Sequence, residues 1–330
     1  MRQSLLELIK CPNCGSEKFF AEEKKSDKSE LREGSVKCRE CSESFSVKKG
    51  ILDLLINPSE EIVKEQKGWT QDESANVNSK EFILSLPRPA DKEHKEWWQE
   101  QADNYEMVLK RLALRGNETV LDIGAGRTWS TRDFAKKGCR AVGIDILREK
   151  FVGLECADYY LGGSVFFERV LADMNALPFK AKSFDVVFST ATLHHSSNLN
   201  ECFGEISRVL KKNGKVVLVN EPTRGVLESK EFKHELVDLG VNEHKYSLPE
   251  WLSAMKRNGF EVEVMMPRSV ERMMETGKVK GDKKYKVFLG KIASFFWRIP
   301  GGKFLLKRMH IAGQLLVGLG VVIIGRKVRG

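Results

Sequence analysis

Four of the seven cysteines stand in two Cys-x-x-Cys pairs, Cys11 with Cys14 and Cys38 with Cys41, and 23 residues separate the pairs. The tight turn of each pair can aim two thiolates at one ion, so two facing pairs complete a tetrahedral four-sulfur zinc site. Four protein ligands leave no open position for a substrate, which favours a structural over a catalytic zinc. A redox role is not indicated, because neither pair opens a helix after a strand.

Histidines near the ends of predicted strands form a second group with chemical potential. His194 and His195 follow a short apolar segment, and His244 stands two residues before Tyr246. Histidine titrates near neutral pH and is the natural base for taking a proton from an oxygen or carbon acceptor. Each of the three can instead have a purely packing role, and Glu221 is a further candidate for proton acceptance. The pattern indicates a base without selecting one.

Glycines and acids mark a third group. Residues 120–126 read VLDIGAG, and glycines in such a turn let a ligand approach the backbone closely. Asp145 ends the next apolar segment, where a carboxylate can accept protons from both hydroxyls of a ribose. Asp173 follows the third segment, where it can meet an adenine amine. Together they indicate a site for an adenosine-containing cofactor.

Short apolar segments rich in β-branched residues must position these groups. Helical segments lie between most of them, which predicts a doubly wound, mostly parallel α/β sheet with its ligand beyond the C-terminal ends of the strands. A helix is predicted over 97–114. The predicted strands are 119–123, 140–144, 165–171, 184–188 and 215–220, followed later in the chain by 260–266 and 316–325.

The ordered motifs VLDIGAG, GIDI, LADMNALPF, FDVVFSTATLHH and ECFGEISRVLKKNGKVVLVNEP closely resemble the class I S-adenosylmethionine-dependent methyltransferases, over about residues 100 to 265. The resemblance implies a Rossmann-like, seven-stranded sheet whose sixth and seventh strands pair as an antiparallel edge. It also implies that the methionine part of the cofactor lies against the glycine turn. The ribose then lies against Asp145, and the adenine lies beside Asp173. The residues carried over in this way are Asp122, Gly124, Ala125, Gly126, Asp145, Ile146, Asp173, Met174, Ser189 and Thr190.

The loop after the glycine turn departs from the family pattern. Thr128 occupies the position of the third glycine, so the loop is bulkier, and Thr128 or Ser130 is predicted to cap the following helix. A nicotinamide dehydrogenase fits less well, because its phosphate-binding turn needs that third glycine.

The chain divides into a zinc-ribbon domain (1–57), a polar linker (58–90) and a methyltransferase domain (91–330). Residues 4 to 57 resemble a small zinc-ribbon module that in some proteins accompanies or activates methyltransferases. The net charge of +9 is uneven, because residues 268–330 hold fifteen basic and three acidic residues. Placing the last two strands isolates 268–314 as a basic insertion with a stripe of apolar and aromatic residues.

The insertion can contact an anionic membrane through residues 284–310, or pack on the domain as a lid with solvated lysines. No Asn-Pro-Pro-Tyr-type sequence follows the fourth predicted strand, which disfavours methylation of an adenine or glutamine amino group. No cysteine ends the fourth or fifth predicted strand, which disfavours covalent attack on a pyrimidine ring. Methylation of an oxygen or carbon of a small molecule, glycan or lipid-linked acceptor remains favoured. RNA held by the ribbon and the insertion is the alternative.

We expect a cytoplasmic protein, which would be peripheral at a membrane surface if the insertion is the membrane contact and not the lid. The first ten residues do not read as a signal peptide, and the apolar run over 311–325 is shorter than a membrane-spanning helix requires. The three remaining cysteines are isolated from one another in the sequence, which does not suggest a disulfide framework.

Overall fold

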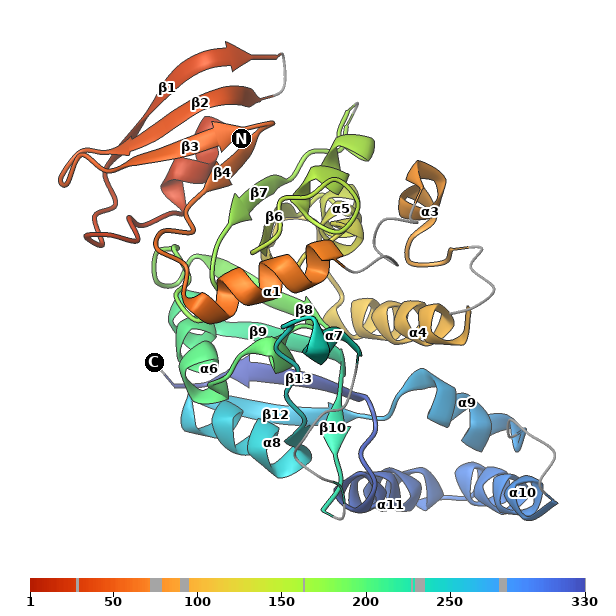
Figure 1. The fold of residues 1–330 in the computed structure, drawn as a ribbon. Coiled ribbons are helices and arrows are strands. Elements are labelled where there is room, and N and C mark those ends of the chain that lie inside the picture. The colour runs from red at the N-terminus through yellow and green to blue at the C-terminus, as the bar shows by residue number, and fades with distance from the viewer. Residues whose placement is uncertain are drawn as a thin grey trace.

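A computed structural model describes residues 1–27, 30–71, 79–89, 95–162, 164–226, 228, 235–278 and 284–329. Its dominant feature is one mixed sheet with the strand order β1-β2-β3-β4-β7-β6-β5-β8-β9-β13-β12 (Figure 1). The strands of this sheet are β1 (Phe19–Ser26), β2 (Leu31–Cys38), β3 (Ser44–Lys48), β4 (Ile51–Asp53), β5 (Thr119–Ile123), β6 (Arg140–Asp145), β7 (Glu168–Leu171), β8 (Phe184–Thr190), β9 (Leu210–Glu221), β12 (Phe260–Met265) and β13 (Val321–Lys327). The short strands β10 (Thr223–Arg224) and β11 (Tyr246–Ser247) pair separately.

Strands β5 to β9 form the predicted parallel part of the sheet. Strand β13 runs antiparallel to both β9 and β12, so the predicted antiparallel edge is present. The last strand begins later than expected. Residue 316 ends a helix, and the apolar run becomes a strand only at Val321, after Gly318 and Gly320 interrupt it.

The sheet has eleven strands where seven were expected, because four N-terminal strands join the seven strands that follow residue 91. Strand β4 pairs in parallel with β7, with Ile51 opposite Arg169 and Leu52 opposite Val170. Pairing of this kind covers the row of backbone groups that β7 would otherwise expose at the edge. Strands from the N-terminal region 1–57 and strands from the region after residue 91 therefore share one sheet. The described residues of the charged stretch 21–34 lie in the β1–β2 hairpin.

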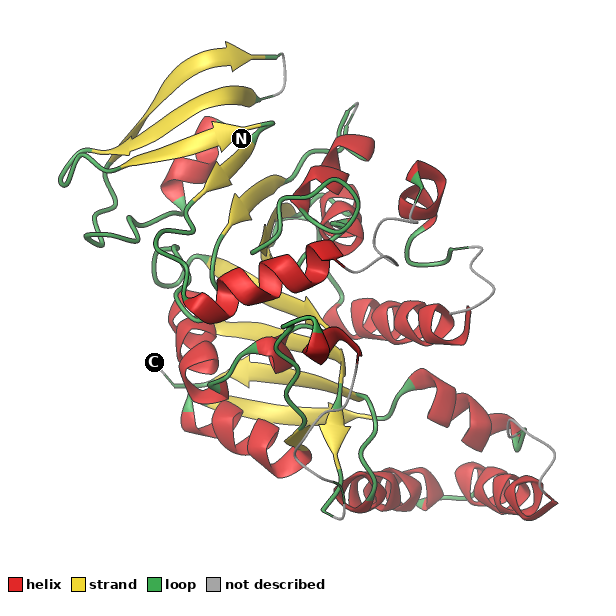
Figure 2. Ribbon diagram, in the orientation of Figure 1, coloured by secondary structure: helices red, strands yellow, loops and turns green. Residues whose placement is uncertain are grey.

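Helices cover both faces of the sheet (Figure 2). Alternation along β8 explains this arrangement, because Val187 packs with residues of α6 and α8 on one face, whereas Phe188 packs with residues of α4 and α5 on the other. The helices are α1 (Glu60–Gln71), α3 (Lys80–Ser85), α4 (Lys95–Leu112), α5 (Trp129–Lys136), α6 (Leu199–Val209), α7 (Glu235–Asp238), α8 (Leu248–Arg257), α9 (Arg268–Thr276), α10 (Lys284–Arg298) and α11 (Gly302–Leu316), with 3-10 turns at Gln3–Glu7, Leu154–Tyr159 and Leu193–His195.

The predicted polar linker over 58–90 contains two helices, α1 and α3. Helix α1 crosses in front of the sheet in Figure 1. Its Gln66 side chain donates a hydrogen bond of 2.7 Å to the backbone oxygen of Ile146, just after β6. The stretch predicted as a linker therefore contains a helix that contacts the loop after β6.

The predicted insertion forms the helices α9, α10 and α11, and the last of these extends two residues beyond the expected end at 314. They occupy the end of the molecule remote from β1–β4 (Figure 1). Within the described ranges, no helix combines the length and the apolar character that a membrane-spanning segment needs.

Candidate active site

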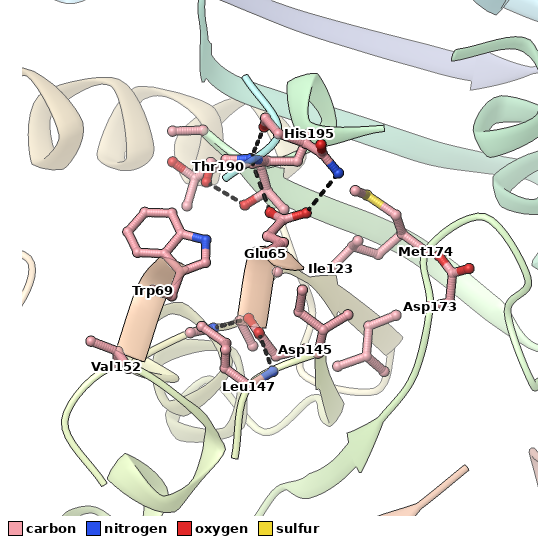
Figure 3. Close-up of a pocket in the computed structure, with 18 of the residues that line it drawn as sticks. Glu65, Trp69, Ile123, Asp145, Leu147, Val152, Asp173, Met174, Thr190 and His195 are labelled. Carbon is pink, nitrogen blue, oxygen red and sulfur yellow. Dashed lines mark hydrogen bonds and ion pairs between the residues drawn. The ribbon is translucent and has the colours of Figure 1, made fainter. Parts of the chain in front are cut away.

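A cavity of about 300 Å³ lies at the C-terminal ends of β5, β6, β7 and β8 (Figure 3). This is where a doubly wound sheet binds its ligands. Loops after these strands form one side of the cavity, and helices α1 and α4 form the other. Of the residues predicted to bind the cofactor, those in the cavity wall are Gly124, Ala125, Gly126, Asp145, Ile146, Asp173, Met174 and Thr190.

The turn after β5 needs glycine for two separate reasons. Gly124 has a φ of +67°, and a Cβ atom there would lie 2.1 Å from Cγ2 of Thr192. Gly126 has a φ of +45°, and its amide donates a hydrogen bond of 2.8 Å to Oδ2 of Asp145. The turn therefore presents bare backbone to the cavity and is attached to the acid at the end of the neighbouring strand.

Asp145 is held in a fixed orientation at the end of β6. Its Oδ2 accepts the Gly126 amide, and its Oδ1 accepts the Leu147 amide at 2.8 Å. Burial raises the pKa of Asp145 to about 6, although these backbone hydrogen bonds oppose the rise. The carboxylate is thus preoriented, and it carries unused lone pairs that can accept hydrogen bonds from a ligand.

Asp122 and Ser189, both predicted to touch the cofactor, lie behind the cavity wall. Asp122 is 1% exposed and accepts hydrogen bonds from the hydroxyls of Ser130 at 2.6 Å and Thr131 at 2.5 Å. Burial raises the pKa of Asp122 to about 7, and its second oxygen has no hydrogen-bond partner. Ser189 is also buried, and its hydroxyl lacks a partner.

The predicted capping of α5 does not occur. Thr128 occupies the N-cap position with a φ of +58°, but its side chain makes no capping hydrogen bond. Ser130 donates to Asp122 instead of closing the helix. The bulkier loop is accommodated because Thr128 takes the left-handed conformation that a glycine would normally supply.

The third and fourth strands place further polar groups in the wall. Asp173 accepts the backbone amide of Asn175 at 2.8 Å, and burial raises the pKa of this carboxyl group. Thr190 donates a hydrogen bond of 2.9 Å to Oε1 of Gln101 on α4. Met174 lies beside Asp173, which gives this end of the cavity an apolar surface next to a carboxylate (Figure 3).

His194 is fixed between two glutamates and does not line the cavity. Its Nδ1 lies 2.8 Å from Oε2 of Glu221, and its Nε2 lies 3.2 Å from Oε2 of Glu243. Burial favours the neutral ring, but the hydrogen bonds to both glutamates outweigh burial and raise the pKa of His194 to about 9. This shift favours the protonated ring at neutral pH, which disfavours His194 as the base.

Glu221, the further candidate for proton acceptance, is used structurally. It is buried and accepts three backbone amides of the turn after β8, those of Thr192, Leu193 and His194, at 3.0 to 3.2 Å. The ion pair with His194 completes its hydrogen bonding. Together they fix the turn that carries the next histidine into the cavity wall.

His195 is the one of the three predicted histidines that lines the described cavity. Its Nδ1 contacts the backbone oxygen of Asn242 and lies 3.1 Å from Oε1 of Glu65 on α1. An Nδ1 proton donated to these oxygens leaves Nε2 as the basic nitrogen. Figure 3 shows His195 above Glu65, and the Trp69 ring approaches the imidazole edge-on at 6.0 Å between centroids.

His244 lies close to the other two histidines, and its amide donates to the His194 backbone oxygen at 3.3 Å. Its Nε2 is buried without a hydrogen-bond partner, and burial lowers the pKa of this ring. Tyr246 donates its hydroxyl proton to the Ser196 backbone oxygen at 2.7 Å. Both residues thus brace the histidine turn, and neither lines the cavity.

The sequence interpretation missed the wall supplied by α1 and α4. Glu61, Ile62, Glu65 and Trp69 come from α1, and Trp97, Trp98 and Gln101 come from α4. The spacing of Ile62, Glu65 and Trp69 places them on one face of a helix, and this was the available signal. It was weak, because most of the other residues of α1 are polar.

The four predicted metal ligands also come together in the N-terminal domain. The Sγ atoms of Cys11 and Cys41 are 3.7 Å apart, and those of Cys14 and Cys38 are 3.6 Å apart. All four sulfur atoms lie within 4.8 Å of one another. The two Cys-x-x-Cys pairs therefore face each other and form a single cluster.

Comparisons with known proteins agree with this geometry. Residues 121–218 match the family Methyltransf_11, described as a methyltransferase domain. The chain is 29% identical over 163 residues to the uncharacterized methyltransferase YcgJ of Bacillus subtilis, covering 48% of this chain and 63% of that protein. It is 34% identical over 128 residues to the malonyl-[acyl-carrier protein] O-methyltransferase of Legionella pneumophila, covering 34% of this chain and 44% of that protein.

The crystal structure of YcgJ matches with a TM-score of 0.44 and 18% identity, covering 69% of this chain and 99% of that chain. This chain spans less than two thirds of the length of the two curated relatives described above. Residues 121–218, the segment that matches the methyltransferase-domain family, extend from β5 into β9.

Proposed function

We propose that this protein is an S-adenosylmethionine-dependent methyltransferase that methylates an oxygen or carbon of a small-molecule, glycan or lipid-linked acceptor. The observation that carries the proposal is the arrangement of Asp145 and the glycine turn at one cavity. A carboxylate with two fixed backbone donors faces bare backbone at the ends of β5 and β6. The cofactor supplies an activated methyl group when bound.

The residues present fit that cofactor. Asp145 can accept the two ribose hydroxyls, and Gly124 and Gly126 add no side chain to the cavity wall beside it. Asp122 keeps one buried oxygen without a partner directly behind the turn, which suits a cationic amine on the ligand side. Asp173 and Met174 offer a hydrogen-bond acceptor and an apolar surface for a purine.

For the acceptor, His195 is the residue we assign as the base. It lies in the cavity wall with its tautomer set by the Asn242 oxygen, and Glu65 stabilises the imidazolium that forms when a proton is taken. Trp69, Trp97 and Trp98 line the same cavity and exclude water from the reacting atoms. The apolar walls and the single base support an oxygen or carbon acceptor.

We also propose that the four-cysteine cluster binds a structural zinc ion. Zinc–sulfur bonds of about 2.3 Å in a tetrahedron place the sulfur atoms about 3.8 Å apart. The Cys14–Cys38 and Cys11–Cys41 sulfur separations, 3.6 and 3.7 Å, fit this geometry. Metal analysis of the purified protein tests the proposal, which requires one zinc per chain, lost in Cys38→Ser with Cys41→Ser.

Calorimetry with S-adenosylmethionine tests the cofactor assignment directly. Wild-type protein should bind it, and Asp145→Ala should not, whereas Asp133→Ala, on α5 outside the cavity wall, should bind as the wild type does. Absence of wild-type binding would contradict the proposed function.

The acceptor class is tested separately by incubating lipid, RNA and soluble-metabolite fractions with methyl-labelled cofactor. Label in the lipid or metabolite fraction supports the proposal. Label found only in RNA would refute it and support the alternative acceptor.

A further inference from the structure

We propose that helices α10 and α11 form a docking surface for an anionic lipid bilayer. The proposal concerns where the protein binds and does not depend on methyl transfer. Its basis is a series of large apolar side chains on α10, α11 and the segment after α11 that the structure leaves exposed beside basic side chains.

The exposed apolar residues follow helical spacing on α10 and continue through α11. Ile292, Phe295 and Phe296 recur at i, i+3 and i+4, which puts them on one face of α10, and Ile299 directly follows the helix. Phe295 and Phe304 are each 64% exposed. The α10–α11 apolar surface consists of Ile292, Phe295, Phe296, Ile299, Phe304, Leu305, Met309, Leu315, Leu316, Val317 and Leu319.

The sides of α10 and α11 that face the rest of the protein pack in a small hydrophobic cluster. Trp297 and Leu306 pack with Met266 and Met274, and Ser294 donates to the backbone oxygen of Glu275 at 3.1 Å. A lid that merely packed on the domain would use this inward face. The apolar surface points away from it and has no covering element among the described residues.

The positive charge of α10 and α11 indicates which partner binds the apolar surface. The chain has no Asp or Glu from residue 283 to residue 330. Lys291, Arg298, Lys303, Lys307 and Arg308 are exposed on the two helices. The Arg308 guanidinium lies 4.6 Å from the Phe304 ring centroid, so a charge stands directly beside an exposed aromatic ring.

An amphipathic surface of this composition suits the interface of an anionic membrane, where apolar side chains enter the acyl boundary and basic ones meet headgroup phosphates. A second copy of the same surface fits poorly, because it would oppose basic residues with basic residues. RNA fits poorly as well, since the exposed set is mostly aliphatic and aliphatic groups neither stack on bases nor neutralise phosphates.

Hydrogen bonds connect α9, the helix on which α10 packs, to the candidate active site. The Arg268 amide at the start of α9 donates to Oδ1 of Asn104 at 2.6 Å. Asn104 donates to Oδ1 of Asn220 at 2.6 Å, and Asn220 donates to Oε1 of Gln101, in the cavity wall, at 2.7 Å. The docking surface and the cavity therefore belong to elements that contact one another through α9.

Flotation of the zinc-loaded full-length protein with vesicles tests the proposal. Vesicles of equal parts phosphatidylcholine and phosphatidylglycerol should bind it, and vesicles of phosphatidylcholine alone should bind it at least about tenfold more weakly. Phe295→Ser with Phe304→Ser should weaken binding at least about tenfold, and so should Lys303→Gln with Lys307→Gln and Arg308→Gln.

Matched controls are Phe20→Ser on β1 and Lys136→Gln with Lys137→Gln on and just after α5, all exposed and far from the surface in the chain. They should bind as the wild type does, and every variant should keep wild-type circular dichroism. Equal vesicle binding by wild type and the two surface variants overturns the proposal. So does retention by single-stranded RNA without vesicle binding, or a dimer that the Phe295→Ser, Phe304→Ser variant dissociates.

Discussion

The side chain of Gln66 donates a hydrogen bond of 2.7 Å to the backbone oxygen of Ile146, and this contact fastens helix α1 across the cavity. Ile146 directly follows Asp145, the acid that we assign to the ribose. The helix brings Glu65 and Trp69 into the cavity wall on either side of the contact. A segment that reads as a linker is thus part of the binding site.

Gln66→Ala should weaken binding of S-adenosylmethionine about three- to tenfold, because the loss of one neutral hydrogen bond costs about 1 kcal/mol. Lys67→Ala, the next residue on the same helix and exposed, is the matched control and should leave the affinity unchanged. Calorimetry measures both. Equal affinities for the two variants would show that α1 does not restrain the cofactor site.

Cofactor affinity should depend on pH through Asp145. Burial raises the pKa of this carboxyl group to about 6, and hydroxyl donors bind its ionised form. Affinity should therefore be nearly full at about pH 7 and above and decline as the pH falls through about 6, by about tenfold between pH 7 and pH 5. Calorimetric titrations of wild type and of Asp145→Asn with S-adenosylmethionine between pH 5 and pH 7 measure this dependence. The variant should bind weakly with a shallower slope, and a flat wild-type profile would contradict the prediction.

Replacing His195 should slow the chemical step without impairing cofactor binding. We expect His195→Gln to lower kcat about 10²- to 10⁴-fold, the usual contribution of a general base, while the dissociation constant for the cofactor stays unchanged. Glu65→Gln should have a smaller effect in the same direction. Single-turnover rates with the acceptor found by labelling provide the measurement. A His195→Gln enzyme with wild-type kcat would exclude His195 as the base.

Replacing His194 should change the free energy of unfolding of the protein. Hydrogen bonds to Glu221 and Glu243 raise its pKa to about 9 against the ordinary 6.5, so the folded state binds the proton more tightly than the unfolded chain. The resulting stabilisation is fully present below about pH 6.5 and is lost as the pH rises through about 9. Its size is about 3 kcal/mol for a shift of this order.

Urea unfolding of wild type and His194→Gln at a series of pH values between 6 and 10 tests this point. The difference in the free energy of unfolding should be largest at the acid end and shrink towards pH 10. Lys211→Gln, which removes a surface ion pair with Asp185, should show a small difference over the same range. A His194→Gln difference that grows with pH would contradict the assignment.

Local patterns in the sequence predicted the parallel strands and most of the cofactor wall. Gly124, Gly126 and Asp145 follow strands directly, so their positions are determined once the strands are recognised. The start of β13 was missed because Leu316 and Val321 belong to one apolar run, and only the glycines between them separate a helix from a strand.

The remaining differences come from contacts between distant parts of the chain. The role of His194 is determined by Glu243, which no local pattern connects to it. The location of Asp122 behind the wall depends on hydroxyls from α5 that turn towards it. The wall formed by α1 depends on packing of a largely polar helix, whose sequence resembles that of many solvent-exposed segments.

The pairing of β4 with β7 has a consequence for the order of events during synthesis. Ile51 and its partner Arg169 are separated by more than a hundred residues. At ribosomal rates of about 5 to 20 residues per second, β4 emerges on the order of ten seconds before β7. During that interval the nascent ribbon presents an open strand edge that can pair with other chains. Cysteine ligands that close early around a metal would limit this exposure, so zinc supply during translation should influence the yield of folded protein.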